Sequence, residues 1–133
     1  MHIQPYLFFD GRTQEALDFY QKAAGAKVEM LMRFSEAPDQ SQIKPESKNK
    51  VMHAQLKIGD TAVLISDGRN QGNPKFDGFA LTIQCKDAAE TEKYFTALSE
   101  GGQVEMPLNK TFFAKSFGML KDKFGVNWMV MAA

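Results

Sequence analysis

Residues 19–30, FYQKAAGAKVEM, decide the fold, because residues 95–106, FTALSEGGQVEM, repeat their pattern. The two stretches lie 76 positions apart in a chain of 133 residues. Both stretches contain the triplet Val-Glu-Met at equivalent positions. At the same offset, Phe19 aligns with Phe95 and Gly25 aligns with Gly101. A repeat of this kind indicates two copies of one structural unit, because one copy alone would leave an apolar face unburied.

Working outward from the triplet, the first half predicts a strand, a helix and three further strands. Thr13 is expected to cap the helix and Gly25 to end it in the left-handed conformation. A polar segment with two prolines, residues 35–50, predicts a long loop, which is either a lid over a binding site or a solvated connection. The expected strands cover residues 6–9, 27–34, 51–58 and 61–66, and the helix covers 13–25.

The second half predicts the same order of elements. Asp87 is expected to cap a helix that Gly101 and Gly102 end. The expected strands cover residues 79–84, 103–106, 114–120 and 126–131, with an irregular stretch at 107–113. We therefore expect one α+β domain built as two βαβββ modules in tandem, with module one at about 1–67, a linker at about 68–77 and module two at about 78–133.

Composition narrows the classes of function. Sixteen basic side chains balance sixteen acidic ones, which gives no electrostatic surface for nucleic acid. No stretch approaches the roughly 20 apolar residues that span a bilayer, and we expect neither a membrane partner nor a signal peptide. The single cysteine, Cys85, favours a reducing, cytoplasmic setting and an inert thiol rather than a nucleophile.

The strand at residues 51–58 carries the strongest candidate for a binding residue. Its alternation places His53, Gln55 and Lys57 on the face opposite Ala54 and Leu56. Histidine titrates near neutral pH, so His53 can contact a ligand, transfer a proton or serve as a hydrogen-bonded structural group, and the sequence leaves all three open. Gln55 and Asn127 are weaker candidates for ligand binding by the same argument.

Segments spread along the chain carry a family resemblance: residues 4–9 (QPYLFF), 16–20 (ALDFY), 51–60 (VMHAQLKIGD), 66–68 (SDG), 117–119 (FGM) and 124–128 (FGVNW). The closing Phe-Gly-Val-x-Trp pattern and the His-Ala-x-Leu-x-Ile-Gly-Asp strand are the more specific signals. Together these segments resemble the vicinal oxygen chelate superfamily, and more narrowly its PhnB-like branch. The resemblance implies the glyoxalase/bleomycin-resistance fold, in which curved mixed sheets surround a cleft, and it implies a homodimer.

Metal-using members of that superfamily take His, Glu or Gln ligands from four strands. The corresponding positions here are Pro5 with Gln4 beside it, His53, Phe79 or Ala80, and Met129. Only His53 is a good ligand for a divalent ion, because a thioether is too soft and catalytic sites need about three protein ligands. We therefore expect no metal and no cofactor, and we keep a divalent metal as the alternative.

Three functions follow as hypotheses. The first is a PhnB-like protein that binds a small, partly apolar molecule in the cleft through His53, Gln55 and Asn127. The second is a metal-dependent lyase or dioxygenase-type enzyme of the same superfamily. The third is an interaction protein without a small-molecule site. The sequence names neither the ligand nor a reaction, because the likeness is one of fold rather than of site chemistry.

Overall fold

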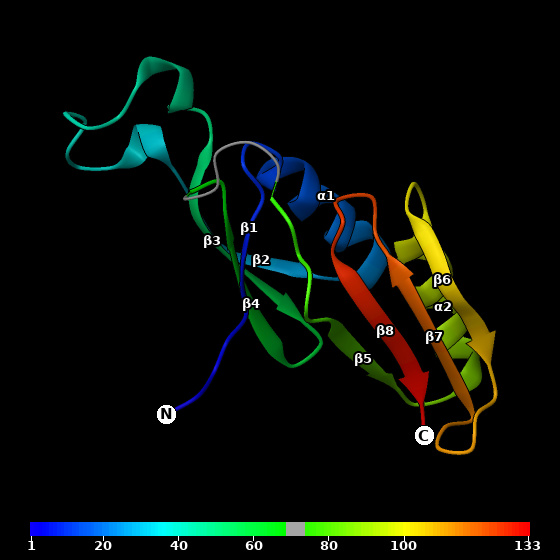
Figure 1. The fold of residues 1–133 in the computed structure, drawn as a ribbon. Coiled ribbons are helices and arrows are strands. Elements are labelled where there is room, and N and C mark those ends of the chain that lie inside the picture. Colours follow the sequence, from blue (N-terminus) through cyan, green and yellow to red (C-terminus); the bar gives the residue numbers. More distant parts are fainter. Residues whose placement is uncertain (69–73) are drawn as a thin grey trace. The chain divides into compact units, whose positions relative to one another are not determined.

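The computed structural model describes residues 1–68 and 74–133, and these form two compact units, Met1–Pro74 and Lys75–Ala133 (Figure 1). Part of the expected linker, residues 69–73, lies outside the described residues. Across the described ranges, no helix has both the length and the apolar character needed to cross a bilayer.

The first unit is a four-stranded sheet with one long helix. Its strand order is β1-β4-β3-β2, with β1 parallel to β4 and the other pairs antiparallel. The helix buries Ala16, Leu17 and Tyr20, and the sheet buries Leu56 and Ile65. The elements are β1 (Tyr6–Phe8), α1 (Thr13–Ala24), β2 (Lys27–Arg33), the short 3-10 helices η1 (Phe34–Glu36) and η2 (Pro45–Ser47), β3 (Val51–Ile58) and β4 (Thr61–Ser66).

The second unit repeats this arrangement. Its strand order is β5-β8-β7-β6, again with the first pair parallel and the others antiparallel. The elements are β5 (Leu81–Cys85), α2 (Ala88–Ser99), β6 (Gln103–Asn109), β7 (Ser116–Lys121) and β8 (Asn127–Ala132). The predicted α+β class with two βαβββ modules in tandem is therefore confirmed.

Two predicted boundaries in the second unit are wrong. Phe79 lies before β5 and is 46% exposed, so the strand begins only at Leu81. β6 runs on through Pro107 to Asn109, where the sequence indicated irregular structure. Proline is tolerated there because β6 is an edge strand, and the pairing with β7 is irregular between Met106 and Asn109.

The repeated Val-Glu-Met triplet forms a β-bulge in both units. Val28 pairs with Leu56 and Met30 with Gln55, so Glu29 is an extra residue on β2. In the second unit, Val104 pairs with Leu120 and Met106 with Met119, which makes Glu105 the extra residue on β6. An extra residue moves the side chains that follow it to the other face of the sheet, so the triplet marks the same change of face in both units.

The start of α1 differs from the prediction. The N-cap residue of α1 is Arg12, and its side chain makes no capping hydrogen bond to the first turn of the helix. Instead, the buried carboxylate of Asp67 accepts hydrogen bonds from the backbone nitrogens of Gly11 (2.6 Å) and Thr13 (3.0 Å) and from the Thr13 hydroxyl (2.7 Å). Its other oxygen accepts from the backbone nitrogen of Val51 at 2.9 Å. One carboxylate thus ties α1, β3 and the end of β4 together.

Gly118 lets α2 approach β7 closely. A Cβ atom at this position would lie 2.6 Å from Phe95 Cε2 and 2.9 Å from a Leu108 methyl carbon. We expect Gly118→Ala to lower the free energy of unfolding by about 1–3 kcal/mol, because a methyl group forced into a packed core displaces its neighbours. Urea unfolding of Gly118→Ala beside Gly68→Ala is the measurement, since a Cβ at Gly68 would make only an ordinary contact, 3.5 Å from Ser66 Oγ. Equal stability of the two variants would contradict this packing.

Candidate functional site

The face of the first sheet opposite α1 holds the candidate site. Ala54 and Leu56 of β3 are fully buried, whereas His53 and Gln55 are only half-buried. Leu64 of β4 pairs with Tyr6 of β1 on one side and with Gln55 of β3 on the other. Gln55 in turn pairs with Met30 of β2, so these four residues form one line across the sheet. Directly opposed residues share a face, so this open face is lined by β1, β4, β3 and β2 in turn.

Three rings lie together on this open face. The Tyr6 and Phe8 rings stack with centroids 4.6 Å apart and planes inclined by 21°. The Tyr6 ring lies 5.7 Å from the His53 ring, and the Tyr6 hydroxyl is 3.0 Å from His53 Nδ1. The hydrogen bond orients the imidazole, because one ring nitrogen is paired with the phenol in either tautomer. Tyr6, Phe8 and His53 are called the ring cluster below.

Gln55 lies next to His53 on the same face of β3. Its side-chain nitrogen donates to Glu29 Oε1 at 3.2 Å, which links β3 to the bulged residue of β2. Met30 pairs with Gln55 and Met32 with His53, so thioethers flank both polar side chains. The face therefore combines stacked rings, thioethers and a few polar groups, which is the composition of small-molecule sites.

Asn127 belongs to the other unit. It begins β8, and its side-chain nitrogen donates to the Phe76 carbonyl oxygen at 2.9 Å. The structure therefore brings His53 and Gln55 together and gives Asn127 a backbone partner of its own.

The loop between β2 and β3 is held by its own hydrogen bonds. The Ser35 nitrogen donates to the Lys48 carbonyl oxygen at 2.9 Å, and the Gln40 amide donates to three backbone carbonyls, at Phe34, Ser35 and Ala37. The segment extends beyond the ends of β2 and β3 (Figure 1). At its base, the Arg33 guanidinium donates to the Asn49 carbonyl and to the Gln14 side chain.

The residues present do not fit a hard or borderline divalent ion. Among residues 1–68 and 74–133, no three His, Cys, Asp or Glu side chains gather closely enough to hold a metal. His53 is hydrogen-bonded to the Tyr6 phenol and pairs in register with Met32, and Phe79 and Ala80 carry no donor atom in their side chains. Divalent ions of this class prefer imidazole and carboxylate ligands.

Both helix N-termini already have carboxylate partners. Asp67 accepts from the first turn of α1, and the Asp87 side chain accepts from the Glu90 nitrogen at 2.8 Å in α2, as the sequence predicted. A helix N-terminus binds phosphate through these same backbone N–H groups. At each strand-to-helix turn, a carboxylate of the chain itself therefore accepts from backbone N–H groups of the kind that would bind a phosphate.

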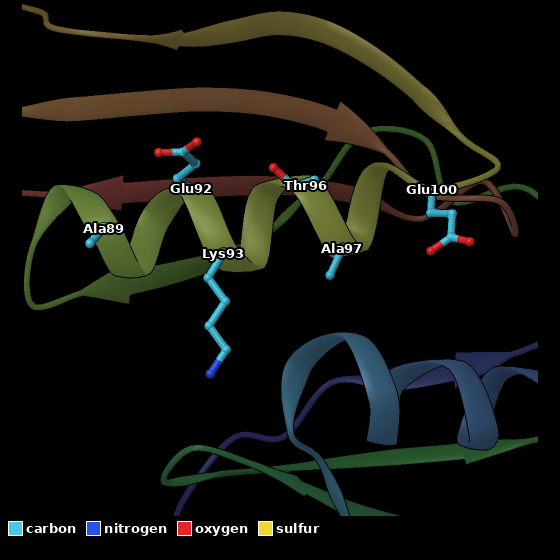
Figure 2. Close-up of a pocket in the computed structure, with 6 residues that line it drawn as sticks. All are labelled: Ala89, Glu92, Lys93, Thr96, Ala97 and Glu100. Carbon is cyan, nitrogen blue, oxygen red and sulfur yellow. The ribbon is translucent and has the colours of Figure 1, made fainter.

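A hollow also lies along α2, but its shape does not suit a ligand. The residues that line it recur every three or four positions, so they form one face of a single helix. Figure 2 shows these residues along α2: Ala89, Glu92, Lys93, Thr96, Ala97 and Glu100. Small-molecule sites enclose most of the ligand surface, which a single helix face cannot do.

Cys85 at the end of β5 is buried, and burial raises the pKa of its thiol, with smaller contributions from Glu90 and Asp87. Thiolate is the reactive form, so we expect slow modification by a thiol reagent at neutral pH and rapid modification in denaturant. Because the pKa is raised on folding, the stability linked to this thiol is fully present below its unfolded pKa and is lost as the pH rises through the higher pKa of the folded state. Equal rates in native and denatured protein would contradict this prediction.

Sequence reasoning missed Tyr6 and Phe8 as members of the site. Residues 6–9 are apolar throughout, so no alternation separates Leu7, which is 2% exposed, from its neighbours on the open face. The parallel pairing of β1 with β4 assigns the faces, and a sequence does not display that pairing. The signal that could have placed Tyr6 on the open face is its hydroxyl group, because a buried hydroxyl needs a hydrogen-bond partner.

Comparison with known proteins agrees with this architecture. A family model described as 3-demethylubiquinone-9 3-methyltransferase matches residues 1–131. Protein YjdN of Escherichia coli is 31% identical over 98% of this chain and 94% of its own length. The crystal structure of protein PA1353 from Pseudomonas aeruginosa is 38% identical, with a TM-score of 0.87 over 99% of this chain and 97% of that one.

Two further structures define the branch and the fold. A Bacillus cereus structure, titled a putative 3-demethylubiquinone-9 3-methyltransferase and PhnB protein, is 26% identical over the full length of both chains, with a TM-score of 0.83. A glyoxylase/bleomycin resistance protein/dioxygenase domain from Frankia shares the fold, with 13% identity and a TM-score of 0.68 over 100% of this chain and 92% of that one. The chain therefore belongs to the family described as 3-demethylubiquinone-9 3-methyltransferase, the PhnB-like branch of the vicinal oxygen chelate superfamily.

Proposed function

We propose that this glyoxalase/bleomycin-resistance-type protein binds a small, partly apolar molecule, without a metal, against the open face of the first sheet. The observation that carries the proposal is the ring cluster, in which the stacked Tyr6 and Phe8 rings adjoin a hydrogen-bonded His53. Stacked rings favour a planar ligand, and the phenol and imidazole supply hydrogen bonds to a polar group on it. Small aromatic carboxylates have this combination of properties.

The methyl-transfer reaction in the family description is not part of this proposal. The contacts of the ring cluster support ligand binding and do not point to methyl transfer.

The binding test uses the full chain, a panel of small aromatic carboxylates beginning with benzoate, and calorimetric titration. We expect His53→Ala to weaken binding about tenfold, because it removes a hydrogen bond and a ring contact. Tyr6→Phe keeps the ring and loses only the hydroxyl, so its effect is expected to be smaller. Lys57→Ala is the matched control, since Lys57 lies on the same strand and face but is exposed at its end. Equal affinity in His53→Ala and the parent would refute the proposed site.

A metal-dependent lyase or dioxygenase-type enzyme is the second candidate. One observation favours it: His53 lies on the open face, at the strand position from which metal-using relatives take a ligand. Protein purified without an affinity tag decides between the two candidates by metal analysis and by thermal unfolding with and without EDTA. The binding proposal predicts no stoichiometric metal and an unchanged Tm. One bound metal ion per chain, whose removal by EDTA lowers the Tm, would support the enzyme instead.

We also propose that the protein is a homodimer in a reducing, cytoplasmic setting, as the family resemblance and the single cysteine suggest. Light scattering on a sizing column measures the mass directly. The proposal expects twice the chain mass, and a mass equal to the 14.9 kDa chain would contradict it.

A further inference from the structure

The open face of the second sheet carries a row of methionines. Met106 of β6 pairs with Met119 of β7, and Met119 pairs in turn with Met129 of β8. The row continues onto β5 at Thr82, which pairs with Met129. Met106, Met119 and Met129 are called the methionine row below, and they place three thioethers on adjacent strands at one level of the sheet.

The three side chains lie on the face away from α2. A Cβ atom at Gly118 would meet Phe95 of α2, so Gly118 faces the helix and Met119 faces the opposite way. Met119 and Met129 are half-buried, and Met106 is 45% exposed. The sulfur atoms are therefore not sealed within the core between the sheet and α2.

The β-bulge is what brings Met106 into the row. Val104 pairs with Leu120 on the helix side, and in a strand without a bulge Met106, two residues further on, would face the same side. With the bulge, Met106 changes face and lies opposite Met119. The methionine row therefore depends on the β-bulge in β6 and not only on the number of methionines in the chain.

We propose that the methionine row is a binding site for a soft monovalent cation, Cu(I) or Ag(I). Thioethers are soft ligands that select such ions over Mg²⁺, Mn²⁺ or Zn²⁺. Directly opposed residues in a sheet have Cβ atoms about 4.5–5.5 Å apart, and methionine has three rotatable side-chain bonds, so three sulfur atoms can converge on one ion above Met119. The site uses none of the residues of the ring cluster, and it does not rest on the proposed function.

The test measures Ag(I) and Cu(I) binding to untagged full-length protein. All variants carry Cys85→Ala, which removes the one thiol that would compete for soft ions. Ag(I) is titrated into protein with ¹³C-labelled methionine methyl groups, and Cu(I) affinity is measured anaerobically by competition with a chromogenic chelator. We expect one ion per chain and methyl shifts confined to the methionine row.

Met119→Leu is the decisive variant, because Met119 is the shared neighbour of the other two residues. Leucine conserves the apolar volume and removes only the sulfur, so the fold is retained. We expect the Kd for either ion to rise about tenfold or more, as on loss of one ligand group from a metal site. Met52→Leu, on β3 of the first unit, is the control and leaves the Kd unchanged. No binding by the parent, or equal binding in Met119→Leu, would overturn the proposal.

Discussion

Asp67→Ala is expected to lower the free energy of unfolding by about 3–5 kcal/mol, because it leaves hydrogen-bond donors at the starts of α1 and β3 without an acceptor. The carboxylate of Asp67 accepts from Gly11, Thr13 and Val51, and it is 8% exposed. Asp67→Asn keeps one acceptor oxygen, so its loss of stability is expected to be smaller. Urea unfolding followed by circular dichroism measures both variants.

The control for Asp67 is Asp60, an exposed aspartate in the turn between β3 and β4. Replacing Asp60 with alanine is expected to change stability by about 0.5 kcal/mol at most. A loss of stability in Asp67→Ala no larger than that of Asp60→Ala would show that Asp67 does not join α1 to the sheet.

Gly102→Ala is the second substitution with a large expected effect. A Cβ atom there would overlap the Lys121 carbonyl oxygen and lie 2.8 Å from the Asp122 carbonyl carbon. Backbone cannot rotate aside as a side chain can, so we expect a loss of about 3 kcal/mol or more, at the upper end of overpacking costs. The chain after α2 must therefore pass close to the end of β7, and only glycine permits this.

Thermal unfolding monitored calorimetrically tests Gly102→Ala beside Gly68→Ala. Gly68 is the appropriate control, because a Cβ there meets no atom closer than 3.5 Å. A variant that unfolds at the temperature of the parent would contradict the close approach of these two segments.

The sequence predicts the order of elements because the repeat and the β3 alternation are local signals. The same signals misplace boundaries: Phe79 is apolar but lies before β5, and Pro107 interrupts a strand pattern without ending the edge strand. Proline lacks a backbone N–H donor, and an edge strand tolerates this because only one of its sides is hydrogen-bonded to another strand. The helix cap at Asp87 was predictable because its acceptor is three residues from its donor, whereas the Asp67 contact spans 54 residues to Thr13.

The candidate site was predictable only in part. The alternation of β3 places His53 and Gln55 on one face, as expected. Nothing local to residues 6–8 predicts that Tyr6 contacts His53, because that contact needs β1 to pair with β4 and β4 with β3. Long-range pairing of this kind is decided by the whole fold rather than by one segment. Likewise, the methionine row depends on bulges that a strict two-residue period does not anticipate.

Magnetic resonance on the full chain tests the central claim, that the open face of the first sheet is a binding surface. The measurement records backbone amide and aromatic side-chain shifts during titration with benzoate or the tightest aromatic carboxylate of the panel. We predict saturable shifts of the Tyr6, Phe8 and His53 rings, with the α1-facing residues Ala54 and Leu56 nearly unmoved. Shifts that gather elsewhere and leave the three rings unchanged would contradict the account.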